Sequence, residues 1–93
     1  MGIDYSLRFA YPDAAAVTAA LRRVPFVREL VSPAVGFEIR TVGNAGEMPD
    51  ATVKVEPYGA YFCVYGGHGR EMLGVVIARL VGEFGAVTIT ELE

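Results

Sequence analysis

Apolar and polar side chains alternate over several short stretches of the chain. In IDYSLRF, residues 3–9, the odd-numbered side chains are apolar or aromatic and the even-numbered ones are polar or charged. Residues 51–56 and 86–92 alternate in the same way, and so do residues 34–42, where Val35 belongs to the apolar side. A period of two residues is typical of a strand with one buried face, so the pattern predicts four strands.

The stretch AYFCVY, residues 60–65, predicts a fifth strand of a different character. Both of its faces are apolar or aromatic, with Phe62 on one side and Tyr61, Cys63 and Tyr65 on the other. Two interpretations fit: a strand buried on both sides, or a central strand whose outer face is lined with tyrosines.

Two further stretches follow the helical period. Between Asp13, a suitable N-cap, and Pro25, which cannot continue a helix, apolar side chains recur every three or four residues. The second helix is predicted to begin after GGHG and to reach Phe84, with an apolar stripe and with Gly85 as its C-terminal glycine.

The connections carry their own signals. Residues 43–50, GNAGEMPD, have the composition of a loop, and residues 57–59, PYG, that of a tight turn. Residues 26–31 stay ambiguous, since FVRELV fits a short strand, a helical turn or a simple connection.

These elements predict a single α+β domain over residues 1–93. The predicted order is β-α-β-β-β-α-β, in an antiparallel or mixed sheet. Right-handed crossovers would place both helices on one face, which gives a two-layer, ferredoxin-like sandwich with an extra hairpin strand. A fold of this kind implies no function by itself.

Composition narrows the classes of function. The net charge is −3 and the pI is near 5.1, with no cluster of basic residues, so we expect no nucleic-acid partner. The single cysteine, Cys63, excludes an intramolecular disulfide and a cysteine-rich zinc site. No apolar run is long enough to span a membrane. We therefore expect a cytoplasmic protein without cofactor, metal or membrane partner.

The motif GGHG, residues 66–69, allows two interpretations. A glycine turn between a strand and a helix can present backbone N–H groups to an anion, with Arg70 assisting. The lysine and hydroxyl residue of a phosphate-binding loop are absent, however, and Met72 breaks the dinucleotide pattern. The simpler interpretation is a turn that leads into the helix without strain.

Catalytic and RNA-binding patterns are weak. His68, the single histidine of the sequence, follows Cys63 by five residues, but a cysteine inside a strand is usually a small buried side chain. The aromatic strand lacks the residue order of an RNA-recognition sheet. A third hypothesis is an enzyme that uses His68 with Arg70 or Cys63. Because these patterns are weak, however, we expect no enzymatic activity.

The tyrosines support the leading hypothesis. Tyr58, Tyr61 and Tyr65 lie on or beside one strand, and tyrosine is favoured at protein interfaces. Tyr61 and Tyr65 share a face with Cys63. If the helices cover the other face, these side chains form an open aromatic patch, and its charged rim is formed by Glu38, Arg40, Lys54 and Glu56. The alternative is that neighbouring side chains or a loop cover the rings.

We therefore predict a small protein-binding domain of the inhibitor or immunity type, which binds another protein or a second copy of itself. The predicted binding residues are Tyr58, Tyr61, Tyr65, Arg40, Lys54, His68 and Arg70. The alternative is a regulatory domain that binds a small molecule at the turn of residues 66–69.

Overall fold

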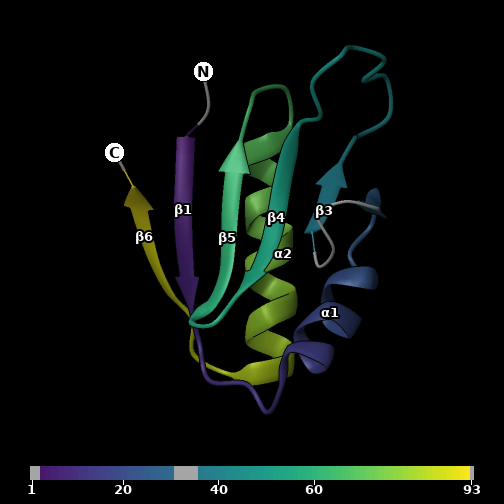
Figure 1. Ribbon diagram of the computed structural model, residues 1–93. Helices are drawn as coiled ribbons and strands as arrows, with labels where there is room; N and C mark the ends of the chain where they lie inside the picture. Colours follow the sequence, from purple (N-terminus) through teal and green to yellow (C-terminus); the bar gives the residue numbers. More distant parts are fainter. Residues whose placement is uncertain (1–2, 31–35, 93) are drawn as a thin grey trace.

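In the computed structural model, residues 3–30 and 36–92 are described, and they form two helices and six strands (Figure 1). In chain order the elements are β1 (Ile3–Arg8), α1 (Ala14–Arg22), β2 (Val27–Glu29), β3 (Gly36–Ile39), β4 (Ala51–Glu56), β5 (Gly59–Val64), α2 (Gly69–Phe84) and β6 (Thr88–Leu92). The predicted α+β class is confirmed.

All six strands belong to one sheet, in the order β2-β3-β4-β5-β1-β6. Each neighbouring pair is antiparallel, which settles the choice between an antiparallel and a mixed sheet. β1 therefore lies inside the sheet, between β5 and β6, although it is the first strand in the chain.

The predicted element order is wrong by one strand. The ambiguous segment contains β2, which pairs with β3 through Val27 opposite Ile39 and Glu29 opposite Phe37. Three residues with one partly buried apolar side chain carry no periodic signal, so the pairing with β3 decides their conformation. Val35, assigned above to a strand, lies outside the described residues.

One hydrophobic core joins the strands to both helices. In β5 the side chains of Ala60, Phe62 and Val64 belong to this core, and Tyr61 and Cys63 point to the other side of the strand. The buried residues contributed by the other strands and the helices include Tyr5, Leu7, Phe37, Ile39, Val53, Val17, Leu21, Met72, Leu73, Val76 and Leu80. In β1, β4 and β5 the alternation read from the sequence separates core residues from outward ones, whereas β6, predicted to bury one face, is exposed on both faces.

The helices are held to the sheet and to each other (Figure 1). α1 begins where predicted, because the Asp13 carboxylate accepts a hydrogen bond of 2.8 Å from the N–H of Ala16. α1 contacts α2 and β4, while α2 contacts β5. Arg23, just after α1, pairs with Glu83 of α2 at 2.8 Å. No helix among the described residues is long and apolar enough to cross a membrane.

The turn between β4 and β5 depends on a close approach of backbone. Gly59 has φ 144°, and a Cβ added there would lie 2.3 Å from the carbonyl oxygen of Leu7. The same Cβ would lie 2.8 Å from Cε1 of Phe9. Only glycine satisfies both the backbone angle and the space, so this position fixes the packing of β5 against β1.

Substitution of this glycine tests that constraint. We expect Gly59→Ala to lower the free energy of unfolding by at least about 2 kcal/mol, because the new methyl group collides with the Leu7 carbonyl. Gly74→Ala is the matched control. Its Cβ would meet no atom within 4 Å, and alanine favours a helix interior by up to about 1 kcal/mol. Urea unfolding measures both, and equal stabilities of the two variants would contradict the interpretation.

Candidate functional site

The outer side of β5 carries the tyrosines singled out in the sequence. Strand register places Tyr61 between Ser6 of β1 and Lys54 of β4, and it places Cys63 between Asp4 and Thr52. The side chain of Tyr61 is half-buried and that of Lys54 is exposed, whereas Cys63 is only 7% exposed. The aromatic patch is therefore accessible at its tyrosines and closed at its cysteine.

A small polar network crosses this surface around Asp4. Hydrogen bonds, first from the Cys63 thiol and then from the Tyr61 hydroxyl, lower the pKa of Asp4. The bond to Asp4 and partial burial raise the pKa of Tyr61. Burial raises the pKa of Cys63, so its thiol stays protonated at neutral pH and is a poor nucleophile.

The other two tyrosines lie at opposite ends of β5. Tyr65 follows the strand and is half-buried, and a hydrogen bond with Thr52 places it on the same surface as Cys63. That bond lowers the pKa of Tyr65, but burial and the proximity of Cys63 outweigh it and the net shift is upward. Tyr58 precedes the strand, and the Arg8 guanidinium lies 4.7 Å from its ring centroid, a cation–π contact.

Next to the Tyr65 end of this surface lies a buried carboxylate that the sequence analysis placed in a loop. Asp50 is only 3% exposed. It accepts hydrogen bonds from the Thr41 hydroxyl at 2.7 Å, from the Asn44 amide, and from the backbone N–H of His68 at 3.0 Å. Burial alone would raise the pKa of Asp50, but these bonds outweigh it and hold the pKa at about 2.

The GGHG turn wraps around this carboxylate. Gly67 has φ 53°, and a Cβ there would lie 3.1 Å from Oδ2 of Asp50. A Cβ at Gly69 would lie 2.5 Å from the backbone oxygen of Asp50. Gly67 and Gly69 are therefore explained by close packing on Asp50, and the carboxylate that meets the His68 N–H belongs to the chain itself.

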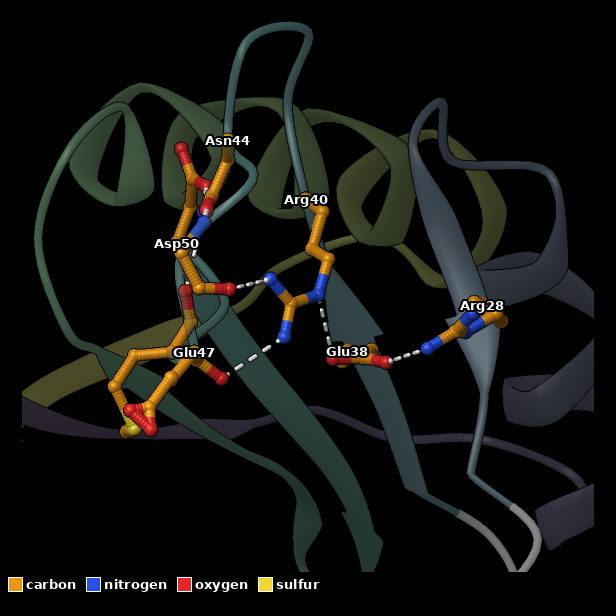
Figure 2. Close-up of polar contacts among 8 residues, drawn as sticks. Arg28, Glu38, Arg40, Asn44, Glu47 and Asp50 are labelled. Carbon is orange, nitrogen blue, oxygen red and sulfur yellow. Dashed lines mark hydrogen bonds and ion pairs between the residues drawn. The ribbon is translucent and has the colours of Figure 1, made fainter.

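Loop 41–50 is braced by an arginine clamp (Figure 2). Arg40 donates to the carbonyl oxygens of Gly46 and Glu47 at 2.7 and 3.0 Å, and to the Glu38 carboxylate at 3.1 Å. Glu38 is 8% exposed, and Arg28 pairs with its other oxygen. The hydrogen bond from Arg28 is the largest cause of the lowered pKa of Glu38.

This bracing leaves apolar side chains of the loop in solvent. Val42 is 85% exposed and Met48 is 55% exposed. Together with Tyr65 and His68 they line a cleft of about 410 Å³ between loop 41–50 and the GGHG turn. A loop with fixed backbone contacts and exposed apolar side chains is a ready contact surface, since little ordering remains to be done on binding.

The predicted binding residues thus fall into three places. Tyr58, Tyr61, Tyr65 and Lys54 follow β4 and β5, and Arg40 supports the neighbouring loop. His68 and Arg70 lie at the start of α2, where the His68 ring is 3.2 Å from Glu71.

Among the residues that the structure describes, no hydrogen bond joins His68 to Cys63, and no three metal-ligating side chains gather at one point.

Asp50 has a role that its sequence context does not reveal, and the prediction that Glu38 lies in an exposed charged rim is wrong, because its side chain is buried under two arginines. The hydrogen-bond partners of these two carboxylates, Asn44 and Arg40, are close in sequence. The burial of Glu38, however, follows from the sheet, and the burial of Asp50 follows from the turn eighteen residues later in the chain.

Comparison of the chain with protein families, with curated proteins and with solved structures finds no match.

The buried carboxylate predicts a dependence of stability on pH. The folded pKa of Asp50, about 2, lies below the ordinary 3.8, so ionised Asp50 stabilises the fold above about pH 5. That contribution, about 2 kcal/mol, is lost as the pH falls from about 5 to about 2.

The Asp50→Asn variant isolates this contribution. Urea unfolding should show a stability difference from the wild type that is largest at neutral pH and shrinks by about 2 kcal/mol between about pH 5 and pH 2. Glu47→Gln, an exposed carboxyl in the same loop, serves as the control. A difference between wild type and Asp50→Asn that does not change with pH would contradict the assignment.

Proposed function

We propose that this chain is a small, non-enzymatic protein-binding domain that acts as an inhibitor or immunity-type protein. The binding surface is the outer face of the sheet along β4 and β5, together with loop 41–50. The proposal includes a cytoplasmic location and a partner that is a protein, either another chain or a second copy.

The proposal rests on a finer interpretation of the fold. We infer that both helices cover the same face of the sheet, since they contact each other and share one core with the strands. β4, β5, β1 and β6 with the two helices then form a ferredoxin-like unit, to which β2 and β3 are added at one edge. The opposite face is left open.

The observation that carries the proposal is the row of half-buried aromatic side chains on that face. Tyr61 and Tyr65 are half-buried, so part of each side chain stays accessible on this face. Rigid aromatic side chains bury a large area at a small entropic cost, which is the property of interface hot spots. Lys54 beside Tyr61 supplies a charged rim.

Loop 41–50 extends this surface. Tyr65 lines the cleft with Val42 and Met48, so the aromatic row and the apolar loop meet at one end of β5. The clamp by Arg40 and the anchor at Asp50 hold the loop in one conformation. A partner that contacts both regions would bury apolar surface at the centre and meet polar side chains at the rim.

The decisive experiment removes the aromatic rings. We expect Tyr61→Ser combined with Tyr65→Ser to weaken binding of an isolated partner by at least about 30-fold, because each ring is an anchor of the proposed interface. Binding is measured by calorimetry with the partner recovered by affinity capture. The control is Val75→Ser, which changes an exposed side chain on α2, away from the proposed surface. Unchanged affinity in the double variant, with its fold intact by circular dichroism, would refute the proposed surface.

A second candidate function follows from the cleft of about 410 Å³. A cleft of this size fits a small ligand, which would make the chain a regulatory domain. A ligand at this place would raise the melting temperature in a thermal-shift screen. The Met48→Lys variant should abolish that increase. If the wild type instead binds a protein partner and no ligand raises its melting temperature, the result supports the first function.

A further inference from the structure

The two edges of the sheet differ in how they are protected. β2, at one edge, has three residues, and two of them are the charged Arg28 and Glu29. Short and charged edge strands discourage pairing with another chain. β6, at the other edge, runs for five residues through Thr88–Leu92, contains no proline or lysine, and pairs with β1 without interruption. β6 lacks the shortness, proline, lysine and bulge that protect many edge strands, and its single charged residue is Glu91.

β6 is also exposed over its whole length. All five residues are exposed, including Ile89 at 46% and Leu92 at 40%. Within residues 3–30 and 36–92, no strand lies beyond β6, and no backbone hydrogen bond outside the sheet and helices involves it. A sequence rich in threonine and isoleucine favours a paired strand, yet one side of this strand offers its N–H and C=O groups to solvent.

We propose that β6 binds β6 of a second copy of the chain, antiparallel and around a two-fold axis at Thr90. An interface on a two-fold axis uses the same surface of both copies, so the strand has to be complementary to itself. Pairing β6 in this way extends the sheet across both copies through main-chain hydrogen bonds.

The register follows from the length and charge of the strand. When the pairing of the two strands is centred on Thr90, all five residues have partners, with Thr88 opposite Leu92 and Ile89 opposite Glu91. No like charges then face each other across the axis. A register centred on Glu91 would place two carboxylates opposite each other, which is unfavourable, and one centred on Ile89 would pair only three residues of the strand.

The proposed pairing also covers the exposed apolar side chains. Each Leu92 would contact Thr88 of the other copy, on the side of the sheet that carries Ser6, because Thr90 lies opposite Ser6 in the register. Ile89 lies opposite Leu7, and so it would be covered on the core side of the sheet. This surface is separate from the tyrosines of β5, so the inference goes beyond the proposed function.

The first test measures self-association with a charge on the axis. Sedimentation equilibrium of the wild type, from about 10 µM to about 1 mM, should show a concentration-dependent dimer, since a single strand pair is a small interface. Thr90→Lys sets two ammonium groups face to face and should weaken the dimer at least tenfold. Val75→Ser on α2 is the control and should leave the dimer unchanged, while Tyr61→Ser with Tyr65→Ser tests self-association through the open face.

The second test reads the register directly and does not depend on the behaviour of Thr90→Lys. Under oxidising conditions Thr90→Cys should form an intermolecular disulfide, because residues that face each other across a two-fold axis lie within disulfide range. Two cysteines at Thr88→Cys would be about 13 Å apart and should not cross-link. The wild type reports the background from Cys63.

A chain that is monomeric at about 1 mM would overturn the proposal. A dimer that Thr90→Lys leaves intact would also overturn it. So would a cross-link that forms as efficiently between cysteines at residue 88 as between cysteines at residue 90. A dimer that is lost only in the tyrosine variant would place self-association on the open face instead. That result would reject the β6 interface while supporting the proposed function.

Discussion

The buried carboxylate of Asp50 is the group on which the geometry of loop 41–50 and of the GGHG turn depends. It joins three segments that are distant in sequence: Thr41 and Asn44 in the loop, the start of β4, and the turn before α2. Its backbone oxygen also accepts hydrogen bonds from the N–H groups of Tyr65 and Gly66. A buried charge is tolerated only where hydrogen bonds satisfy it, so the loop and the turn must keep the geometry that surrounds Asp50.

This constraint explains why the GGHG turn, which resembles an anion-binding motif, has a structural role. An external phosphate at the GGHG turn would have to compete with a carboxylate that already accepts the N–H of His68 and packs on two glycines. Two negative charges at this distance would repel each other, and the buried one cannot leave without breaking the loop anchor. The accessible part of the turn is therefore its outer surface, in the cleft that it shares with Val42 and Met48.

Sequence reasoning recovered the elements whose signal is local. β1, α1, β4, β5 and α2 were found because apolar side chains repeat along each of them, and Asp13 and Gly85 mark helix ends by their own chemistry. The strand at Val27–Glu29 was left ambiguous because its conformation is imposed by β3. The tyrosines could be placed on one surface from their alternation alone. Asp50 could not, since nothing near it in sequence reveals that a turn eighteen residues later will bury it. Long-range packing converts an ordinary loop aspartate into an anchor.

The open face and the exposed edge acquire a combined meaning if both are used. Strand pairing around an axis normal to the sheet keeps corresponding faces of the two copies on one side. Both rows of tyrosines would then face the same direction. The two β5 strands would be separated by β1 and β6 of each copy. At the usual spacing between strands this separation is about 24 Å. Two rigid aromatic rows at a fixed distance favour a partner that carries two matching sites, because the second contact forms at a high effective concentration. The pairing of β6 would thus determine how many binding sites the assembly carries. The tyrosines and the loop held by Asp50 would determine which partner surface is recognised.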